Sequence, residues 1–485
     1  MSTTLQRTTF ETSRLLEFFS EKELQMQIGF ARWHWPLALL KELIDNALDA
    51  CETAGILPEI AITLEPDALS IRDNGPGLPA ETLERSLDYT VRVSDKAYYV
   101  SPTRGQLGNA LKCLWAAPYV VHGEQGFVEV TTGALTHRIA VRLDRIAQQP
   151  DLQHLTSPDG FVKTGTLVKV TWPEIAGSLN QAGDAGFYND VAKLLQGYAA
   201  FNPHVTLTYH APGGPMRWLH TMPDWHKWQP RHPTSPHWYT VERLRFLIAA
   251  YLAEERRRGQ AKTVREFVAE FAGLSGSVKP KRVTEAAGLS RAYLHDLIAD
   301  HDVALEPVAV LLAAMQAESR PVKPAALGVL GEAHVRSFLT THAAVEPESI
   351  TYYKAVGEVD GLPYVLEVAC GWYTEAYAAC DQRTLVGVNW TPALKMPFPE
   401  LAQWLGECRV DSFDPVAVFV HLALPRVEYT DRGKSVLAAS AALSSTLAKG
   451  VLAVTKPWKA LKRQADRDDR VRAREMEHAL QQRRR

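Results

Sequence analysis

The sequence predicts a multidomain α/β protein. Its 485 residues, 46% of them hydrophobic, exceed what one ordinary domain accommodates. Segments with helical periodicity and segments with alternating periodicity also follow one another in separate blocks. These blocks predict an α/β domain over residues 1–230, a helical domain over 231–323, a second α/β domain over 324–458 and a charged tail over 459–485.

The first block contains both helical and strand patterns. Apolar residues recur at helical spacing over 15–30 and 37–54, and Gly55 follows the second of these predicted helices. Alternating residues predict strands between Ile60 and Ile71, a hairpin over 127–143 and a further strand over 165–173. We expect an antiparallel sheet with helices stacked on one face.

The remaining blocks follow a connecting segment. Residues 212–239 are rich in Pro, Trp and His, and the irregular spacing of the histidines, without cysteines nearby, favours a connection over a metal site. The pattern over 241–318 is helical. Period-2 segments return from residue 350 onwards as PYVLEVA, TLVGVNW and VAVFVHLAL, and a helix is predicted over 433–454.

Charge and cysteine content restrict the possible partners and compartment. The formal net charge is only −2, so contact with nucleic acid would depend on local basic patches such as Arg256–Arg258. The five cysteines include no C-x-x-C pair, which argues against a zinc site and a disulfide framework. The N-terminus resembles no signal peptide, and Ser435–Val454 is too polar for a membrane span, so we expect a cytoplasmic protein without membrane contact.

An acidic stripe lies on the predicted helix 37–54. Glu42, Asp45, Asn46 and Asp49 occupy positions i, i+3, i+4 and i+7, which places them on one side of the helix. Taken alone, this spacing is typical of a solvated helix face.

Three further motifs add chemistry to this stripe. Asp73 comes directly after a strand and is followed by Gly75 and Gly77; these glycines allow a ligand to approach the backbone, and a buried carboxylate accepts a hydrogen bond from an amine. A loop that opens a helix offers amides to phosphates, and consists of Arg104, Gly105, Gln106, Leu107, Gly108 and Asn109. Finally, Gly165-Thr166 places a hydroxyl at the start of a strand.

In this order, the four motifs resemble the N box and three G boxes of the GHKL ATPases, whose nucleotide domain is the Bergerat α/β sandwich. The resemblance implies ATP and Mg²⁺ as cofactors, with Glu42 as general base, Asn46 as the metal ligand and Asp73 as the adenine contact. It also implies nucleotide contacts from Asp49, Gly75, Gly77, Arg104, Gly105, Gln106, Leu107, Gly108, Asn109 and Thr166.

The flanking sequence narrows the resemblance to one branch. EFFSEKELQMQIGF, KELIDNALDACETAGILPEI and VAVFVHLALPRVEYTDRGKSVLA are similar to the B subunits of topoisomerase VI, the type IIB DNA topoisomerases. This similarity implies a helix-two-turn-helix-like middle domain and a transducer with a ribosomal S5 domain 2-like fold. It also implies that Lys434 contacts the terminal phosphate of ATP, whereas composition alone favours a solvated lysine.

The same resemblance implies partners. Two copies would associate when ATP binds and enclose double-stranded DNA, while a tyrosine-bearing A subunit would cleave the DNA. Asn109 and Ala110 depart from the glycines that usually continue the phosphate loop, and we recognise no cleavage centre in the sequence. The alternatives are a stand-alone ATP-gated DNA clamp of repair, defence or a mobile element, and a chaperone-like or kinase relative.

Overall fold

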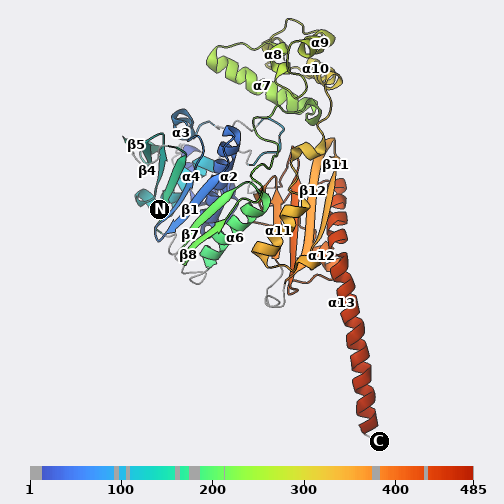
Figure 1. Cartoon of the computed structure of the whole chain (residues 1–485). Helices are drawn as coiled ribbons and strands as arrows, with labels where there is room; N and C mark the ends of the chain where they lie inside the picture. The colour runs from blue at the N-terminus through green and yellow to red at the C-terminus, as the bar shows by residue number, and fades with distance from the viewer. Residues whose placement is uncertain are drawn as a thin grey trace, which may run out of the picture.

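The computed structural model describes residues 14–91, 98–104, 110–158, 164–173, 186–211, 213–373, 383–430 and 435–483. Figure 1 shows an N-terminal α/β body (14–218), a helical body (236–318) above it and a C-terminal α/β body (324–483) at its side. The prediction of a multidomain α/β protein is confirmed.

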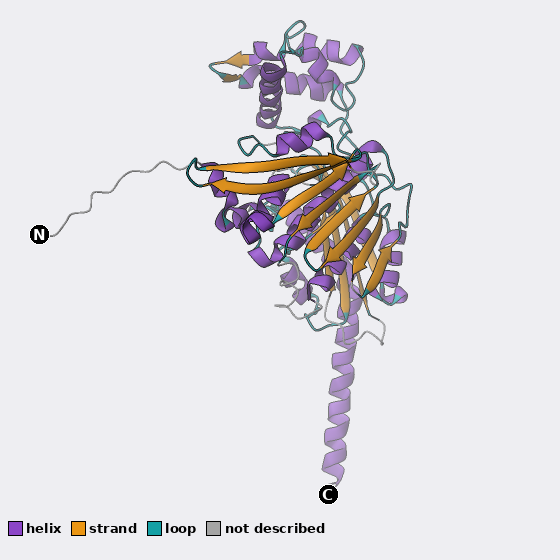
Figure 2. Cartoon of the chain, turned by 90° about the vertical axis from the view of Figure 1, so that its left-hand side faces the viewer, coloured by secondary structure: helices purple, strands orange, loops and turns teal. Residues whose placement is uncertain are grey.

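The N-terminal body consists of one large sheet and a layer of helices. Its described helices are η1 (Arg14–Phe19), α1 (Glu21–Ile28), η2 (Arg32–His34), α2 (Trp35–Ala54), α3 (Ala80–Ser86), α4 (Ala110–His122), η3 (Gly123–Gln125) and α6 (Gly186–Phe201). Its described strands are β1 (Glu59–Glu65), β2 (Ala68–Asp73), β3 (Phe127–Thr132), β4 (Leu135–Asp144), β5 (Gln149–Pro158), β6 (Thr166–Thr171), β7 (Thr206–Ala211) and β8 (Gly214–Trp218). Helices α2, α4 and α6 contact the sheet and form one layer behind it, as Figure 2 shows.

The sheet has the strand order β5-β4-β3-β6-β2-β1-β7-β8. Its strand pairs are antiparallel, as expected, except that β1 and β7 pair in parallel, with Ile62 opposite Tyr209. Strand β7 reaches this position after α6, which returns the chain along the helical layer. The sequence patterns predicted the β3–β4 hairpin and β6, but they missed β5, β7, β8 and α6.

Local capping explains where the first helices begin and end. The segment predicted as one helix over 15–30 is divided at Ser20, whose hydroxyl accepts a hydrogen bond from the amide of Glu23 and caps α1. Helix α2 begins at Trp35 with Pro36 in its first turn, and it ends at Gly55, which has φ 72°. Leu40, Ile44 and Leu48 of α2 are buried in the core.

The helical body agrees with the predicted helical pattern. It contains η4 (Pro236–Trp238), α7 (Val241–Arg258), α8 (Val264–Ala269), α9 (Val278–Ala286), η5 (Leu294–Leu297), the short pair β9 (Ile298–Ala299) and β10 (Asp302–Val303), and α10 (Leu305–Glu318). Thr240 caps α7, and Thr263 forms a capping box with Glu266 at the start of α8.

The C-terminal body has a five-stranded sheet in the order β11-β12-β15-β13-β14, in which β13 and β15 are parallel. Its strands are β11 (Thr351–Val359), β12 (Leu362–Trp372), β13 (Arg383–Val388), β14 (Thr391–Pro392) and β15 (Val416–Ala423). Its helices are η6 (Pro324–Leu327), α11 (Glu332–Ala343), η7 (Pro347–Ser349), α12 (Leu401–Glu407) and α13 (Ala441–Arg483).

Two different surfaces cover this second sheet. Helices α12 and α13 pack on one face, where Leu447 and Val451 of α13 join the apolar core. The other face meets α6 of the N-terminal body, and the rings of Phe201 and Phe419 lie 5.0 Å apart. The helix predicted over 433–454 begins later, at Ala441, and continues to Arg483 as a projecting helix through most of the predicted tail (Figure 1).

The contact between α6 and the second sheet depends on a glycine in β13, which has no side chain to keep the two apart. A Cβ atom at Gly387 of β13 would lie 2.7 Å from ring atoms of the fully buried Phe201. We expect Gly387→Ala to lower the free energy of unfolding by about 1–3 kcal/mol, because the rigid ring cannot move aside. Urea unfolding of the full chain measures this change.

Gly406→Ala in α12 is the matched control. A Cβ at Gly406 meets no atom within 4 Å, and alanine favours a helix by up to about 1 kcal/mol over glycine. A Gly387→Ala protein as stable as the wild type would contradict the packing described for this contact.

Candidate functional site

A cavity of about 1560 Å³ lies between the N-terminal body and the C-terminal body. Helix α2, the turn after β2, the start of α4 and the start of β6 line its larger part. Thr391 of β14 and the nearby Tyr429 line the opposite side. The volume exceeds the roughly 300–1,000 Å³ of typical small-molecule sites, because the cavity continues from the sheet into the gap between the bodies.

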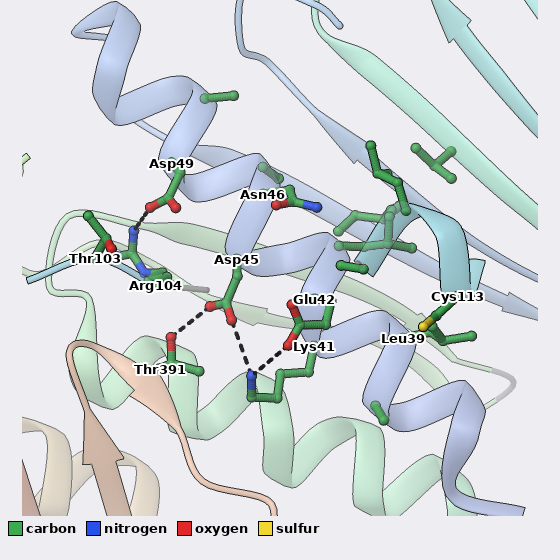
Figure 3. Close-up of a pocket in the computed structure, with 18 of the residues that line it drawn as sticks. Leu39, Lys41, Glu42, Asp45, Asn46, Asp49, Thr103, Arg104, Cys113 and Thr391 are labelled. Carbon is green, nitrogen blue, oxygen red and sulfur yellow. Dashed lines mark hydrogen bonds and ion pairs between the residues drawn. The ribbon is translucent and has the colours of Figure 1, made fainter. Parts of the chain in front are cut away.

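The acidic stripe of α2 is divided between ligand-facing and structural positions. Asp45 and Asp49 are buried, with relative exposures of 2% and 6%, whereas Asn46 is exposed in the cavity and Glu42 is half-buried. Figure 3 shows all four side chains projecting from the same stretch of α2. The interpretation of this stripe as a solvated helix face is therefore wrong, since water does not reach two of its carboxylates.

Asp45 joins α2 to the C-terminal body. Its carboxylate accepts hydrogen bonds of 2.8 Å from the hydroxyls of Tyr198 and Thr391, and it lies 3.2 Å from the Lys41 ammonium. Lys41 also lies 3.5 Å from Glu42. Burial alone would lower the pKa of Lys41, but the carboxylates of Asp45 and Glu42 outweigh burial and raise it above its usual value. A permanent cation therefore lies beside Glu42.

Asp73 lies at the sheet end of the cavity. Its Oδ1 accepts hydrogen bonds from the amides of Gly75 and Thr166, at 2.8 and 3.2 Å. Burial raises the pKa of the Asp73 carboxyl, and these bonds oppose that rise. Gly77 has φ 92°, and a Cβ there would lie 2.7 Å from Oγ1 of Thr132, so the turn after Asp73 requires glycine.

Arg104 is held by a cluster of buried polar side chains. Its guanidinium lies 2.8 Å from Asp49 and donates two hydrogen bonds of 2.8 Å to Glu52, and it also contacts Asn202. The Lys227 ammonium, from the connecting segment, lies 2.7 Å from Glu52. We call these five residues the Arg104 cluster.

Charge balance determines the ionisation of this cluster. Burial alone would raise the pKa of Glu52, but the neighbouring Arg104 and Lys227 outweigh burial and hold that pKa well below its usual range. The Lys227 ammonium also lies 4.4 Å from the ring centre of Trp390, and Asn202 donates to the Trp390 carbonyl at 2.9 Å. The cluster therefore reaches the C-terminal body as well.

The structure brings most of the predicted site residues together. Glu42, Asn46, Asp49, Asp73, Gly77, Arg104 and Thr166 all line the cavity. Gly75 lies beside Asp73, to which its amide donates. The predicted phosphate-loop residues Gly105, Gln106, Leu107, Gly108 and Asn109 lie outside the described residues, as does Lys434.

Two predicted nucleotide contacts have a different environment from the one expected. The side chains of Asp49 and Arg104 bind each other and the rest of the Arg104 cluster, so they shape the cavity wall through protein contacts. Sequence reasoning missed Glu52, Asn202 and Lys227. Glu52 follows Asp49 by three residues on the same stripe of α2, which was the available signal, whereas nothing in the sequence indicated that the other two residues would lie nearby.

Two other kinds of feature are absent from the part of the chain that the structure describes. There, no group of three or more His, Cys, Asp or Glu side chains is arranged to hold a metal ion. Of the helices that the structure describes, none is long and apolar enough to cross a lipid bilayer.

Comparison with known proteins identifies the class that this fold and site resemble. Over most of its length, the chain is similar to B subunits of a type 2 DNA topoisomerase, as the sequence motifs predicted. These relatives are the B subunits of type 2 DNA topoisomerase 6. The protein of Archaeoglobus fulgidus is 23% identical over 83% of this chain and 66% of its own length. That of Metallosphaera sedula is 23% identical over 90% of this chain and 81% of its own length.

Other comparisons are more limited. The Methanosarcina barkeri relative is 29% identical, over 41% of this chain and 32% of its own length. The chain thus spans just under two thirds of the Archaeoglobus protein and about a third of the Methanosarcina protein. A solved N-terminal domain of a DNA repair protein is 12% identical, with a TM-score of 0.41, over 88% of this chain and 95% of the solved chain. No family model matches the chain.

The charge balance of the Arg104 cluster leads to a stability prediction. Glu52→Gln keeps the shape of the side chain but leaves Arg104 and Lys227 with too little buried negative charge. We expect a loss of about 3–5 kcal/mol, the cost of breaking a buried ion pair by removing one partner. The midpoint of urea unfolding, followed by tryptophan fluorescence, measures this loss.

Glu65→Gln is the control for this measurement. Glu65 pairs with Lys169 at 2.7 Å on the surface, where both side chains are more than one third exposed. An exposed pair contributes about 1 kcal/mol or less. Equal midpoints for the two variants would show that the Arg104 cluster is not the stabilising contact described above.

Proposed function

We propose that the chain is the ATP-binding and ATP-hydrolysing subunit of a type IIB topoisomerase-like complex. The observation that carries this proposal is the cavity that gathers Glu42, Asn46 and Asp73, in the same order along the chain as in the GHKL ATPases. The similarity to topoisomerase 6 B subunits supports it. On this proposal, the N-terminal body is a Bergerat-fold domain, the helical body is helix-two-turn-helix-like and the C-terminal body is a transducer.

The sheet end of the cavity suits the adenine base. A buried carboxylate at Asp73 accepts a hydrogen bond from an exocyclic amine, and low local polarity strengthens that bond. Gly77, whose positive φ favours glycine, lines the cavity in the turn that follows Asp73. Thr166, whose amide already bonds to Asp73, supplies a second polar group beside the base.

The α2 side of the cavity suits the phosphates and their metal. Mg²⁺ prefers oxygen ligands and usually keeps several waters, so the exposed amide oxygen of Asn46 fits as a single protein ligand. Bound Mg²⁺ would neutralise charge on the phosphates. Helix α4 begins directly after the predicted phosphate loop, and the amides of a helix N-terminus favour an anion.

Glu42 is the proposed general base. It lies one helical turn before Asn46, so it can accept a proton from a water that Asn46 and the phosphates help to place. Lys41, held by Asp45, restrains the Glu42 carboxylate from the other side. Because Thr391 also binds Asp45, the C-terminal body contacts the same helix that carries the base.

These contacts support a gate mechanism. Two copies would associate on binding ATP, enclose double-stranded DNA and reopen after hydrolysis. Lys434 would carry the state of the terminal phosphate to the C-terminal body, and a tyrosine-bearing A subunit would cleave the DNA. The B-subunit likeness supports these assignments, and the domain limits at residues 230, 323 and 458 belong to the same proposal.

Replacing the proposed base separates binding from hydrolysis. We expect Glu42→Ala to lower kcat for ATP by at least about 100-fold, the usual contribution of a general base, with little change in ATP affinity. Phosphate release and equilibrium binding measure the two effects. Glu124→Ala, on a side chain that is 70% exposed, is the control. Unchanged turnover in Glu42→Ala would reject the base assignment.

The proposed complex can be tested on DNA. Mixed with an A subunit of topoisomerase VI and supercoiled plasmid, the chain should relax the DNA only when ATP and Mg²⁺ are present. Glu42→Ala should abolish repeated turnover in the same assay. ATP hydrolysis and DNA retention without any relaxation would instead favour the stand-alone DNA clamp.

A further inference from the structure

A chain of polar contacts connects β14 of the C-terminal body to the proposed base. The Thr391 hydroxyl donates a 2.8 Å hydrogen bond to Oδ1 of Asp45, whose Oδ2 lies 3.2 Å from the Lys41 ammonium. That ammonium lies 3.5 Å from Oε1 of Glu42. Figure 3 shows these contacts as dashed lines. Glu42 is thus joined, through Lys41 and Asp45, to a residue of the other body.

Thr391 is held in place by the turn that precedes it. Strands β13 and β14 are joined by two residues, Asn389 and Trp390, which both have positive φ, 47° and 64°. The Asn389 side chain exchanges hydrogen bonds of 2.9 and 3.0 Å with the backbone of Leu424, and the Trp390 side chain is fully buried. The hydroxyl of Thr391 therefore has a defined position beside α2.

Helix α6 also approaches β14 closely at this point. A Cβ atom at Gly197 would lie 2.8 Å from the proline of β14, so a glycine permits the approach. The next residue, Tyr198, places its hydroxyl 2.8 Å from Oδ1 of Asp45 and 2.9 Å from the Lys41 carbonyl. Because a hydroxyl carries a single proton, these two acceptors share it. Among the described residues, the Thr391 hydroxyl donates to Asp45 alone, so Oδ1 depends chiefly on Thr391.

The Lys41 ammonium is the group that contacts the base. Its side chain is 14% exposed and ends on a flexible stem, so its contacts decide where the charge lies. Asp45 holds it from one side, and Glu42 lies on the other. The Glu42 side chain is 27% exposed and lines the cavity. A general base acts only within hydrogen-bond reach of the proton that it accepts, so an ammonium held in place beside Glu42 orients its carboxylate for that step.

We propose that Lys41 and Thr391 are positioning residues, through which the C-terminal body orients the Glu42 carboxylate for hydrolysis. This inference rests on the proposed ATP site and on Glu42 as its base. Lys41 acts on Glu42 directly, and Thr391 acts through Asp45. The proposed contacts with adenine and Mg²⁺ involve neither residue. Loss of the positioning contacts therefore lowers the rate of hydrolysis and leaves ATP affinity unchanged.

The first test removes the Thr391 hydroxyl. Thr391→Val keeps the size of the side chain and loses one hydrogen bond, so we expect kcat for ATP to fall about 5-fold in the full chain. The dissociation constant for ATP should not change. Thr391→Ser, which restores the hydroxyl, should return kcat to the wild-type value. Phosphate release and equilibrium binding of ATP measure the two quantities.

The second test removes the Lys41 ammonium. Hydrogen bonds between charged groups are roughly twice as strong as neutral ones, so we expect Lys41→Met to lower kcat by at least about 10-fold, again with unchanged ATP affinity. Lys41→Arg keeps the charge and should recover most of the lost rate. Lys41→Met also leaves the buried Asp45 without its cation; if that variant does not fold, the Thr391 variants still decide the proposal.

Gln196→Met is the matched control for Thr391→Val. Gln196 of α6 donates a 2.6 Å hydrogen bond to the His342 carbonyl of α11, so it also joins the two α/β bodies. It is not among the residues that line the cavity. The variant therefore loses one hydrogen bond between the bodies and keeps the chain of contacts to Glu42. We expect wild-type kcat and wild-type ATP affinity.

A double variant shows whether Thr391 acts through Glu42. In Glu42→Ala no carboxylate remains to be oriented, so adding Thr391→Val should lower the residual single-turnover hydrolysis no further. A further loss of about 5-fold in that background would place the effect on another group and would overturn the proposal.

The outcomes separate the inference from the proposed function. A wild-type chain that hydrolyses no ATP, or a Glu42→Ala chain with unchanged turnover, overturns the proposed function. If Glu42→Ala loses turnover but Thr391→Val keeps the wild-type kcat, the positioning role is overturned while the ATP site stands. Weaker ATP binding by Thr391→Val, or an equal loss of rate in Gln196→Met, would indicate a structural role and would also overturn the positioning role.

Discussion

The Arg104 guanidinium is fully buried, and a buried cation is tolerated only where carboxylates neutralise it. Asp49 and Glu52 supply that charge from the last turns of α2, while Lys227 restores the balance from the connecting segment. Three parts of the chain that are far apart in sequence are thereby held at one point. The wall of the cavity, the path of the chain out of the N-terminal body and the contact with Trp390 all depend on this point.

Helix α2 serves several purposes, each with different residues. Its apolar side, with Leu40, Ile44 and Leu48, holds it against the sheet. Its polar side is shared: Glu42 and Asn46 face the cavity, whereas Asp45 binds Thr391 of the C-terminal body. Helix α2 therefore contacts both the cavity and the second body, so it is the element through which the two adjoin.

Residues from separate bodies therefore form the wall of the cavity. The C-terminal body contributes Thr391 and Tyr429 to its wall. The helical body contacts the chain just before the wall residues Thr103 and Arg104, since the Tyr239 hydroxyl accepts a hydrogen bond from the amide of Val100. A ligand that contacts several of these bodies favours one relative placement of them. It shifts the equilibrium between two placements only by the difference in its affinity for the two. The proposed nucleotide-operated gate requires a site of this kind, to which more than one body contributes.

The sequence by itself determined the local features. The periodicity and Gly55 defined α2 closely, and alternation defined the β3–β4 hairpin. The order of Glu42, Asn46, Asp73 and Thr166 identified residues that meet in the cavity. Only the tertiary structure decided the parallel pairing of β1 with β7 and the partners of Arg104. It also decided the burial of Asp45 and Asp49 on a stripe that looked solvated. Periodicity reports the neighbours within one helix or strand, whereas burial and charge pairing depend on residues that only the folded chain brings together.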